Sequence, residues 1–278
     1  MILNVKVRSS SNEGKSSITA RHLYECCPVC ESKNIEYVLQ ADCSMHPLYN
    51  KKLPNIMRWM KCNDCTHSFT EGYYTDEALA ILLEKAHDFQ IMNVDTLERD
   101  RIISSDMVDK VASVLGKQKG KWLDVGFGNG ALLMTCAEYG FEPVGIDLRR
   151  APVEKIKEIG IEAHCMDFSQ FKQSDRYSVI SMTDVLEHIP YPKKALEIAH
   201  SLLKPHSVLF ISCPNTNSLV WKVATEARLN KYWMEIEHYH NFGRTRLYSL
   251  LSEHGFRPVH YGVSKRYRIG MEIIAVKV

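Results

Sequence analysis

The chain has 278 residues, of which 45% are hydrophobic and 24% charged, and its formal net charge is +2. This weak charge argues against a long nucleic acid or an anionic membrane surface as a partner. No apolar stretch reaches the roughly 18 residues of a membrane-spanning helix, and residues 1–6 lack the apolar core of a signal peptide. We therefore expect a globular, cytoplasmic protein, and nothing in the composition indicates its oligomeric state.

Composition divides the chain into four parts. Residues 1–22 are polar and rich in serine, which is typical of a loose N-terminus. Residues 23–75 contain cysteines and prolines but few periodic apolar runs, so a domain this small needs a stabilising cross-link in addition to its core. Residues 76–115 show helical spacing and predict two linking helices. Residues 116–278 are long enough to form the main domain.

Four cysteines form two CxxC pairs, which are Cys27 with Cys30 and Cys62 with Cys65. Each pair can present two thiolates to one metal ion, and four sulfur ligands in tetrahedral geometry favour Zn²⁺. Because four thiolates leave no open coordination position, we expect a structural zinc site in a zinc-ribbon-like domain spanning residues 23–75.

After Gly116, short β-rich runs alternate with helical runs, which is typical of a doubly wound α/β sheet. The last two strands are joined by only a few residues, so they should form an antiparallel hairpin. The predicted fold is an α/β, doubly wound, seven-stranded and mostly parallel sheet whose last strand is antiparallel. The expected strands cover residues 122–125, 143–147, 161–165, 177–182, 207–212, 258–264 and 271–278.

A glycine-rich turn follows the first of these strands. Gly126, Gly128 and Gly130 let the backbone turn sharply and approach a ligand, and the next helix points its free N–H groups over the turn. Asp147 ends the second strand about 20 residues later, where a carboxylate can accept hydrogen bonds from both hydroxyls of a ribose. On spacing alone, a dinucleotide site of the relaxed GxGxxA form, ending at Ala131, remains open.

The ensemble of motifs resembles the class I S-adenosylmethionine-dependent methyltransferases over residues 100–278. The shared features are the glycine turn, Asp147, the pair Asp167 and Phe168, the run at residues 184–188 and the closing hairpin. The resemblance implies S-adenosyl-L-methionine as the cofactor and a Rossmann-like methyltransferase domain over residues 116–278.

The same resemblance implies a role for each motif residue in the methionine half of the cofactor site. Asp124 and the backbone at Gly126 and Gly128 would surround the methionine part, whose ammonium a carboxylate can balance. Asp184 would border the cavity in which the methyl group is transferred. Without a ligand role, Asp124 would only cap the glycine turn and Asp184 would cap a helix.

For the adenosine half, the resemblance implies four residues. Asp147 would hold the ribose and Leu148 would pack on the adenine. Asp167 would accept a hydrogen bond from the exocyclic amine of the adenine, and Phe168 would offer its backbone amide to a ring nitrogen.

A histidine is the expected base for an acceptor that must lose a proton. His238 follows Glu237 and precedes an aromatic residue, which resembles a motif of small-molecule and sugar methyltransferases. We expect His238 to act as the base and Glu237 to orient it or the substrate. The alternative is structural, with one of His238 and His240 buried and the other exposed. His188 is a rival base for which we favour a structural role.

Three basic residues lie in the last hairpin connection, at Lys265, Arg266 and Arg268. They could contact a phosphate, but a solvated loop is the interpretation that we favour.

Several functions remain open. A zinc ribbon ahead of this fold resembles both methyltransferases of sugars or natural products and certain ribosomal RNA guanine methyltransferases. The glutamate–histidine motif and the weak net charge favour a small-molecule acceptor, such as a sugar or another metabolite with a hydroxyl or carbonyl group. The alternatives are an RNA base methyltransferase, a non-catalytic cofactor-binding interaction protein and, more remotely, an NAD-linked oxidoreductase.

Overall fold

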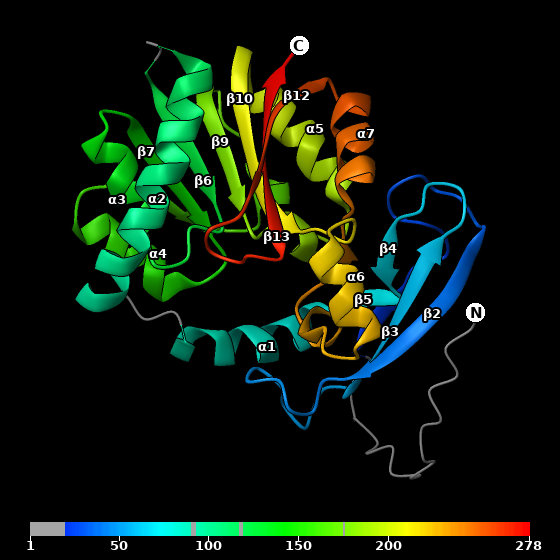
Figure 1. The fold of residues 1–278 in the computed structure, drawn as a ribbon. Helices are drawn as coiled ribbons and strands as arrows, with labels where there is room; N and C mark the ends of the chain where they lie inside the picture. The colour runs from blue at the N-terminus through cyan, green and yellow to red at the C-terminus, as the bar shows by residue number, and fades with distance from the viewer. Residues whose placement is uncertain (1–19, 90–92, 117–118, 175) are drawn as a thin grey trace.

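The computed structural model describes residues 20–89, 93–116, 119–174 and 176–278. A large α/β domain holds most of the helices, and a smaller β-rich part lies beside it (Figure 1). Within the described residues, no helix has the length and apolar character needed to cross a bilayer.

The predicted seven-stranded sheet is confirmed. Its strand order is β12-β13-β10-β9-β6-β7-β8, and only β13 runs antiparallel to its neighbours. One strand is longer than expected because pairing begins directly after the preceding helix and is then interrupted by a bulge before Val208. The strands are β6 (Lys121–Val125), β7 (Glu142–Asp147), β8 (Glu162–Cys165), β9 (Tyr177–Thr183), β10 (Leu203–Pro214), β12 (Phe256–Val263) and β13 (Gly270–Lys277).

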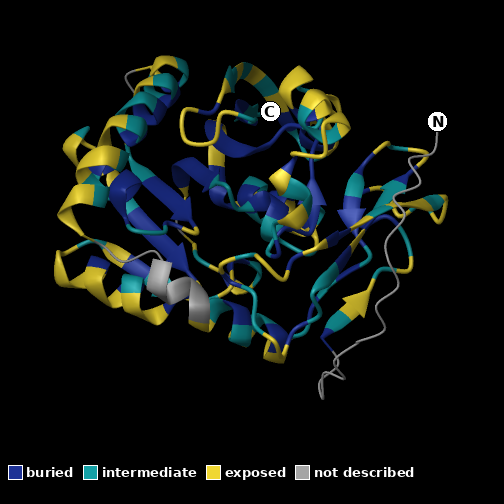
Figure 2. Cartoon of the chain, turned by 60° about the horizontal axis from the view of Figure 1, so that its bottom comes forward, coloured by how far each residue is buried: buried dark blue, intermediate teal, exposed yellow. Residues whose placement is uncertain are grey.

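Helices cover both faces of this sheet. Alternation along β6 places Trp122 in the cluster beneath α2 and α3, and Leu123 in the cluster beneath α5 and α7. Figure 2 shows the central strands as buried and the outer faces of the helices as exposed. The helices are α2 (Val94–Leu115), α3 (Ala131–Glu138), α4 (Arg150–Glu158), α5 (Pro192–Leu202), α6 (Leu219–Glu226) and α7 (Arg244–Glu253).

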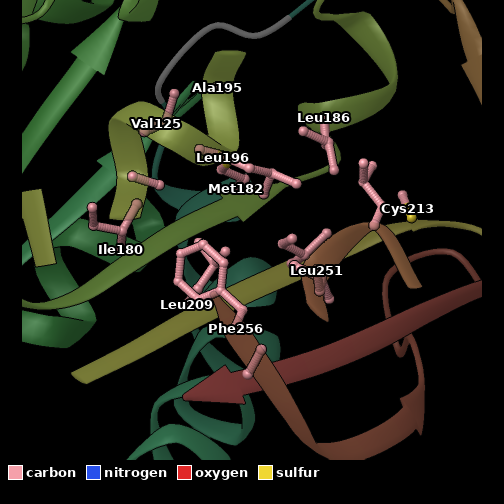
Figure 3. Packing of buried hydrophobic residues seen from close by; sticks show 14 of the residues in the cluster. Val125, Ile180, Met182, Leu186, Ala195, Leu196, Leu209, Cys213, Leu251 and Phe256 are labelled. Atoms are coloured by element: carbon pink, nitrogen blue, oxygen red, sulfur yellow. The ribbon is translucent and has the colours of Figure 1, made fainter. Parts of the chain in front are cut away.

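The larger hydrophobic core lies between the sheet and α5 with α7. Side chains from β6, β9 and β10 meet those of both helices, and each of these residues is almost completely buried. Figure 3 shows part of this cluster, including Val125, Ile180, Met182, Ala195, Leu196, Leu209, Leu251 and Phe256. This packing fixes the ends of β6 and β9, where the polar residues of the site lie.

Residues 76–115 form two helices, α1 (Asp76–Phe89) and α2. They differ in their packing. Met107, Val108 and Val111 of α2 belong to the same core cluster as Trp122 and residues of α3. Helix α2 is therefore a layer of the α/β domain, while α1 lies below that domain in Figure 1.

The smaller part contains two sheets, and the larger one includes a short strand from a distant part of the chain. Strands β1 (Arg21–Leu23) and β5 (Gly72–Tyr74) pair with each other, while β2 (Ile35–Asp42), β3 (Ile56–Cys62) and β4 (Ser68–Thr70) form a larger sheet. The fourth strand of that sheet is β11 (His240–Asn241), which pairs antiparallel with β4. Of the N-terminal segment 1–22, residues 1–19 lie outside the described residues, and residues 21 and 22 belong to β1.

Candidate active site and cysteine cluster

The glycine turn connects β6 to α3. Gly126, Gly128 and Gly130 all have positive φ, at 67°, 63° and 81°. At Gly126 an added Cβ would lie 2.6 Å from Cγ2 of Val185, so this position excludes a larger residue on both conformational and steric grounds. The backbone of the turn is thereby kept free of side chains where a ligand would approach it.

Asp124 is buried directly beneath this turn, at 2% exposure. Trp122 Nε1 donates to Ser181 Oγ at 2.8 Å, and Ser181 Oγ donates to Asp124 Oδ1 at 2.6 Å. Burial raises the pKa of Asp124 to about 7, although the Ser181 hydrogen bond and the charge of Arg266 oppose that shift. Asp124 is therefore a carboxyl group that a nearby cation would ionise.

A cavity opens above Asp124 and encloses about 430 Å³, including its open mouth. Helix α2, the glycine turn and the last hairpin connection all contribute to its wall. Arg266, which we expected on a solvated loop, lines the cavity, and its Nη1 lies 3.8 Å from Oδ2 of Asp184. The lining residues are Asp100, Ile103, Ser104, Met107, Asp124, Gly126, Phe127, Asn129, Ala131, Leu132, Thr183 and Arg266.

Asp147 lies at the end of β7 and accepts four hydrogen bonds. The backbone N–H of Gly128 donates to Oδ2 at 3.2 Å, and the backbone N–H of Arg149 donates to Oδ1 at 2.9 Å. The Arg149 side chain adds a bidentate contact, from Nε to Oδ1 at 2.8 Å and from Nη2 to Oδ2 at 2.7 Å. Four donors fill the acceptor capacity of a carboxylate, so a further donor must displace one of them. Sequence motifs gave no indication of this role for Arg149.

The other predicted adenosine-site residues lie in varied environments. The Leu148 side chain is 45% exposed, so a flat apolar ligand could pack on it. Asp167 caps a short 3₁₀ turn by accepting from the Ser169 N–H at 2.6 Å, and Phe168 is buried in the core beneath that turn.

Asp184 follows β9 at positive φ, 55°. Ser212 Oγ donates to Asp184 Oδ1 at 2.7 Å, while Oδ2 has no hydrogen bond among the described residues. Burial raises the pKa of Asp184, opposed chiefly by the charge of Arg266. The helix-capping alternative is not what the structure shows, because the Asp184 carboxylate pairs with a strand serine and an arginine instead.

His238 lies in a buried cluster with Glu187 and His188. One ligand atom from each side chain lies within 4.8 Å of the others, and the rings of His188 and His238 meet edge to face at 4.8 Å. Oε2 of Glu187 and Nδ1 of His238 have no hydrogen-bond partner among the described residues. Burial lowers the pKa of His238 and raises that of Glu187, so both side chains favour their neutral forms.

The residues around His238 differ in part from expectation. His188 Nδ1 lies 3.0 Å from the backbone oxygen of Glu237, so the contact of Glu237 here is through its main chain. His240 is fully buried, and its Nδ1 lies 3.1 Å from Nε2 of His67, a residue of the N-terminal part. Because His238 and His240 are both buried, the alternative with one exposed histidine is wrong.

The four cysteines of the CxxC pairs come together as predicted. Their sulfur atoms all lie within 4.8 Å of one another, with Cys27 Sγ 3.7 Å from Cys65 Sγ and Cys30 Sγ 3.5 Å from Cys62 Sγ. A tetrahedron with metal–sulfur bonds of about 2.3 Å has edges of about 3.8 Å, so this arrangement fits Zn²⁺. Such a site is closed, which suits a structural role.

Taken together, the sheet order, the antiparallel last strand and the glycine turn over a buried carboxylate define the class I methyltransferase fold. The chain belongs to the methyltransferase domain family, whose pattern it matches over residues 97–261.

Curated relatives share part of this domain. The ubiquinone biosynthesis O-methyltransferase of Histophilus somni is 34% identical over 118 residues, which cover 38% of this chain and 50% of that protein. The protein of the same name from Salmonella enteritidis is 30% identical over 126 residues, covering 42% and 51%. The chain therefore spans about half the length of these relatives.

Solved structures show the same fold. The 1,6-didemethyltoxoflavin-N1-methyltransferase of Burkholderia thailandensis is 17% identical, covers 78% of this chain and 97% of its own, and has a TM-score of 0.56. The magnesium protoporphyrin IX methyltransferase of Synechocystis is 20% identical, covers 67% and 89%, and has a TM-score of 0.52.

Proposed function

We propose that the chain transfers the methyl group of S-adenosylmethionine to a small-molecule acceptor. The observation that carries this proposal is the buried carboxyl group of Asp124 beneath a side-chain-free glycine turn, at the floor of a cavity in a methyltransferase-family domain. The cationic ring nitrogen of an oxidised nicotinamide dinucleotide carries no hydrogen to donate to that carboxylate, whereas the amino-acid end of S-adenosylmethionine has an ammonium group that can donate to it.

The residues present fit the cofactor. Asp124 would balance the ammonium, with the backbone of Gly126 and Gly128 alongside the methionine part. Asp184 would border the reacting end, near Arg266. The bound cofactor supplies a methyl group on a positively charged sulfur, and the protein mainly has to hold the acceptor in line with it.

At the adenosine end, the ribose hydroxyls would replace the Arg149 side chain on Asp147 while the two backbone donors remain. Leu148 would pack on the adenine, and Asp167 with the backbone of Phe168 would bind its polar edge. Asp167 is free to do so with the carboxylate oxygen that does not cap the 3₁₀ turn.

For the acceptor, we propose an oxygen nucleophile deprotonated by His238. The names of the curated relatives point to O-methylation of ubiquinone precursors and do not single out a sugar. His238 is buried and neutral, as a base must be before it takes a proton. Glu237 would orient the acceptor at the mouth of this cluster, since its side chain is only half-buried.

Calorimetry with S-adenosylhomocysteine tests the cofactor site. We expect saturable binding to the wild-type protein and an affinity at least about 10-fold lower for Asp147→Asn, because the lost hydrogen bonds involve a charged acceptor. Glu142→Gln, at the exposed start of the same strand, is the matched control and should bind as the wild type does. Absence of binding at millimolar ligand would reject the proposal.

The same protein can be tested against RNA. An RNA methyltransferase would bind a structured RNA with an affinity that falls steeply as salt rises. We expect no such affinity, since the net charge is +2.

Asp124 makes cofactor binding dependent on pH. Its pKa of about 7 means that lowering the pH from 8 to 6 protonates most of the carboxyl group, and a protonated Asp124 cannot balance an ammonium. Binding therefore has to release a proton, and we expect the affinity for S-adenosylhomocysteine to be about 10-fold lower at pH 6 than at pH 8. In Asp124→Asn this dependence should largely disappear; an equally steep dependence in the variant would assign it to another group.

A further inference from the structure

Two neighbouring side chains in the candidate active site each have a buried polar atom that makes no hydrogen bond within the described residues. These atoms are Oε2 of Glu187 and Nδ1 of His238, and both side chains are at least nine-tenths buried. One ligand atom of each lies within 4.8 Å of the other and of His188. A buried polar group without a hydrogen bond destabilises the folded protein. Two such groups side by side therefore indicate a hydrogen bond that forms at one stage of the catalytic cycle.

We propose that Glu187 is the positioning residue of His238, and that it selects the form of the imidazole that can accept a proton. This inference rests on the proposed function, in which His238 is the base. It assigns to Glu187 the orienting role that the sequence pattern suggested for Glu237.

The chemical reason is the tautomer of the imidazole. An ionised Glu187 accepts the Nδ1–H of His238 and leaves a lone pair on Nε2 to take the acceptor's proton. A neutral Glu187 donates its own O–H to Nδ1, which places the imidazole proton on Nε2 and blocks the base. The pair therefore works as a base only after Glu187 has ionised.

Methyl transfer breaks one bond and forms another. The acceptor oxygen forms a bond to the methyl carbon, and the carbon–sulfur bond breaks with its electron pair passing to sulfur. The acceptor's proton passes to Nε2 of His238. The sulfur loses its positive charge in that step while the imidazole gains one. An anionic Glu187 stabilises the resulting imidazolium.

The groups around the pair oppose both protonation of His238 and ionisation of Glu187. His238 is faced by His188, His46 and His240 and by the side chain of Asn241, and the histidines oppose its protonation. Glu187 is faced by Asp184, whose negative charge opposes a second carboxylate, and by the thiol of Cys213. A cationic sulfur bound near Asp184 would offset that repulsion and favour the ionised form of Glu187.

Glu237 does not have the geometry for this role. Its backbone oxygen holds Nδ1 of His188 at 3.0 Å, which fixes the His188 ring as a wall against the edge of His238. Among the described residues, no hydrogen bond joins the carboxylate of Glu237 to His238. Glu187 and Glu237 can therefore be compared by the same substitution, since one carboxyl group lies inside the cluster and the other at its margin.

The decisive experiment observes the tautomer directly by ¹⁵N NMR of histidine-labelled protein, free and saturated with S-adenosylhomocysteine. The His238 signals are assigned by their loss in His238→Gln. In the wild type we expect the Nε2–H tautomer while Glu187 is neutral, and a change to the Nδ1–H tautomer as rising pH ionises Glu187. In Glu187→Gln the Nε2–H tautomer should persist across the pH range, whereas Glu237→Gln should show the wild-type change of tautomer.

Several results would overturn the inference. One is a wild-type change of the His238 tautomer with pH that persists in Glu187→Gln with melting unchanged, and another is the loss of that change in Glu237→Gln alone. A third is a second equivalent of divalent metal in the wild type that disappears in Glu187→Gln, because Glu187 would then be a metal ligand. Since calorimetry reads cofactor binding separately, failure of the proposed function is distinguishable from failure of this inference.

Turnover provides a second readout. A wrongly held tautomer in a comparable carboxylate–histidine pair lowers kcat by about 10⁴-fold, and we expect a decrease of about 10²-fold or more for Glu187→Gln. The pH profile should also lose the limb that reports ionisation of Glu187, in which the rate rises with pH. For Glu237→Gln the profile should keep its shape.

Discussion

Replacing Cys62 with serine is expected to abolish both zinc retention and methyl transfer. Cys62 ends β3, and β3 pairs with β4, which in turn pairs with β11. Strand β11 begins two residues after His238, so the cysteine cluster and the proposed base are joined through one small sheet. Binding of a structural zinc ion contributes on the order of 10 kcal/mol to the folding of small domains, so its loss should unfold this sheet.

The measurements are zinc content, limited proteolysis and turnover. We expect about one equivalent of zinc in the wild type and under about 0.2 in Cys62→Ser, with new cleavage in residues 23–75. Cys26→Ser is the matched control, because Cys26 adjoins the cluster without belonging to it. Wild-type protein purified without chelator that holds less than about 0.5 equivalents would argue against the zinc site, and full turnover in Cys62→Ser would contradict the coupling.

The second large effect is expected for His238→Ala. Removing a general base slows the chemical step by about 10²- to 10⁴-fold, while the cofactor pocket, which His238 does not line, should keep its affinity. The assay follows formation of S-adenosylhomocysteine with a panel of hydroxyl-bearing small molecules that includes sugars. His260→Ala, on the edge strand β12, is the control. Unchanged turnover with any accepted substrate would remove His238 from the mechanism.

The architecture of the α/β domain could be predicted because its signals are local. The apolar runs that end at Val125 and Asp147 are buried strands, and the glycines between them require positive φ whatever surrounds them. The CxxC pairs are equally local, since two cysteines three positions apart already form half of a metal site. In each case the structure depends on a few residues that are neighbours in the sequence.

What could not be predicted depends on contacts between distant segments. Two residues at 240–241 carry no strand periodicity, and they become β11 only because β4 offers an open edge. Arg149 follows Asp147 closely, but only the folded turn brings its guanidinium onto that carboxylate. Glu187 precedes His188 in a turn common to the fold, and its proximity to His238 arises from a loop some 50 residues later.

The Arg149 contact means that the free protein already holds a cation where the ribose would bind. That side chain is 7% exposed while it is paired with Asp147. An incoming ribose is neutral, so exchanging the two would send a positive charge outward and leave the carboxylate with neutral partners. Cofactor binding would thus increase the positive charge exposed beside β7 by about one unit. A charge-sensitive separation, such as ion-exchange chromatography at low salt, could therefore resolve loaded from empty molecules.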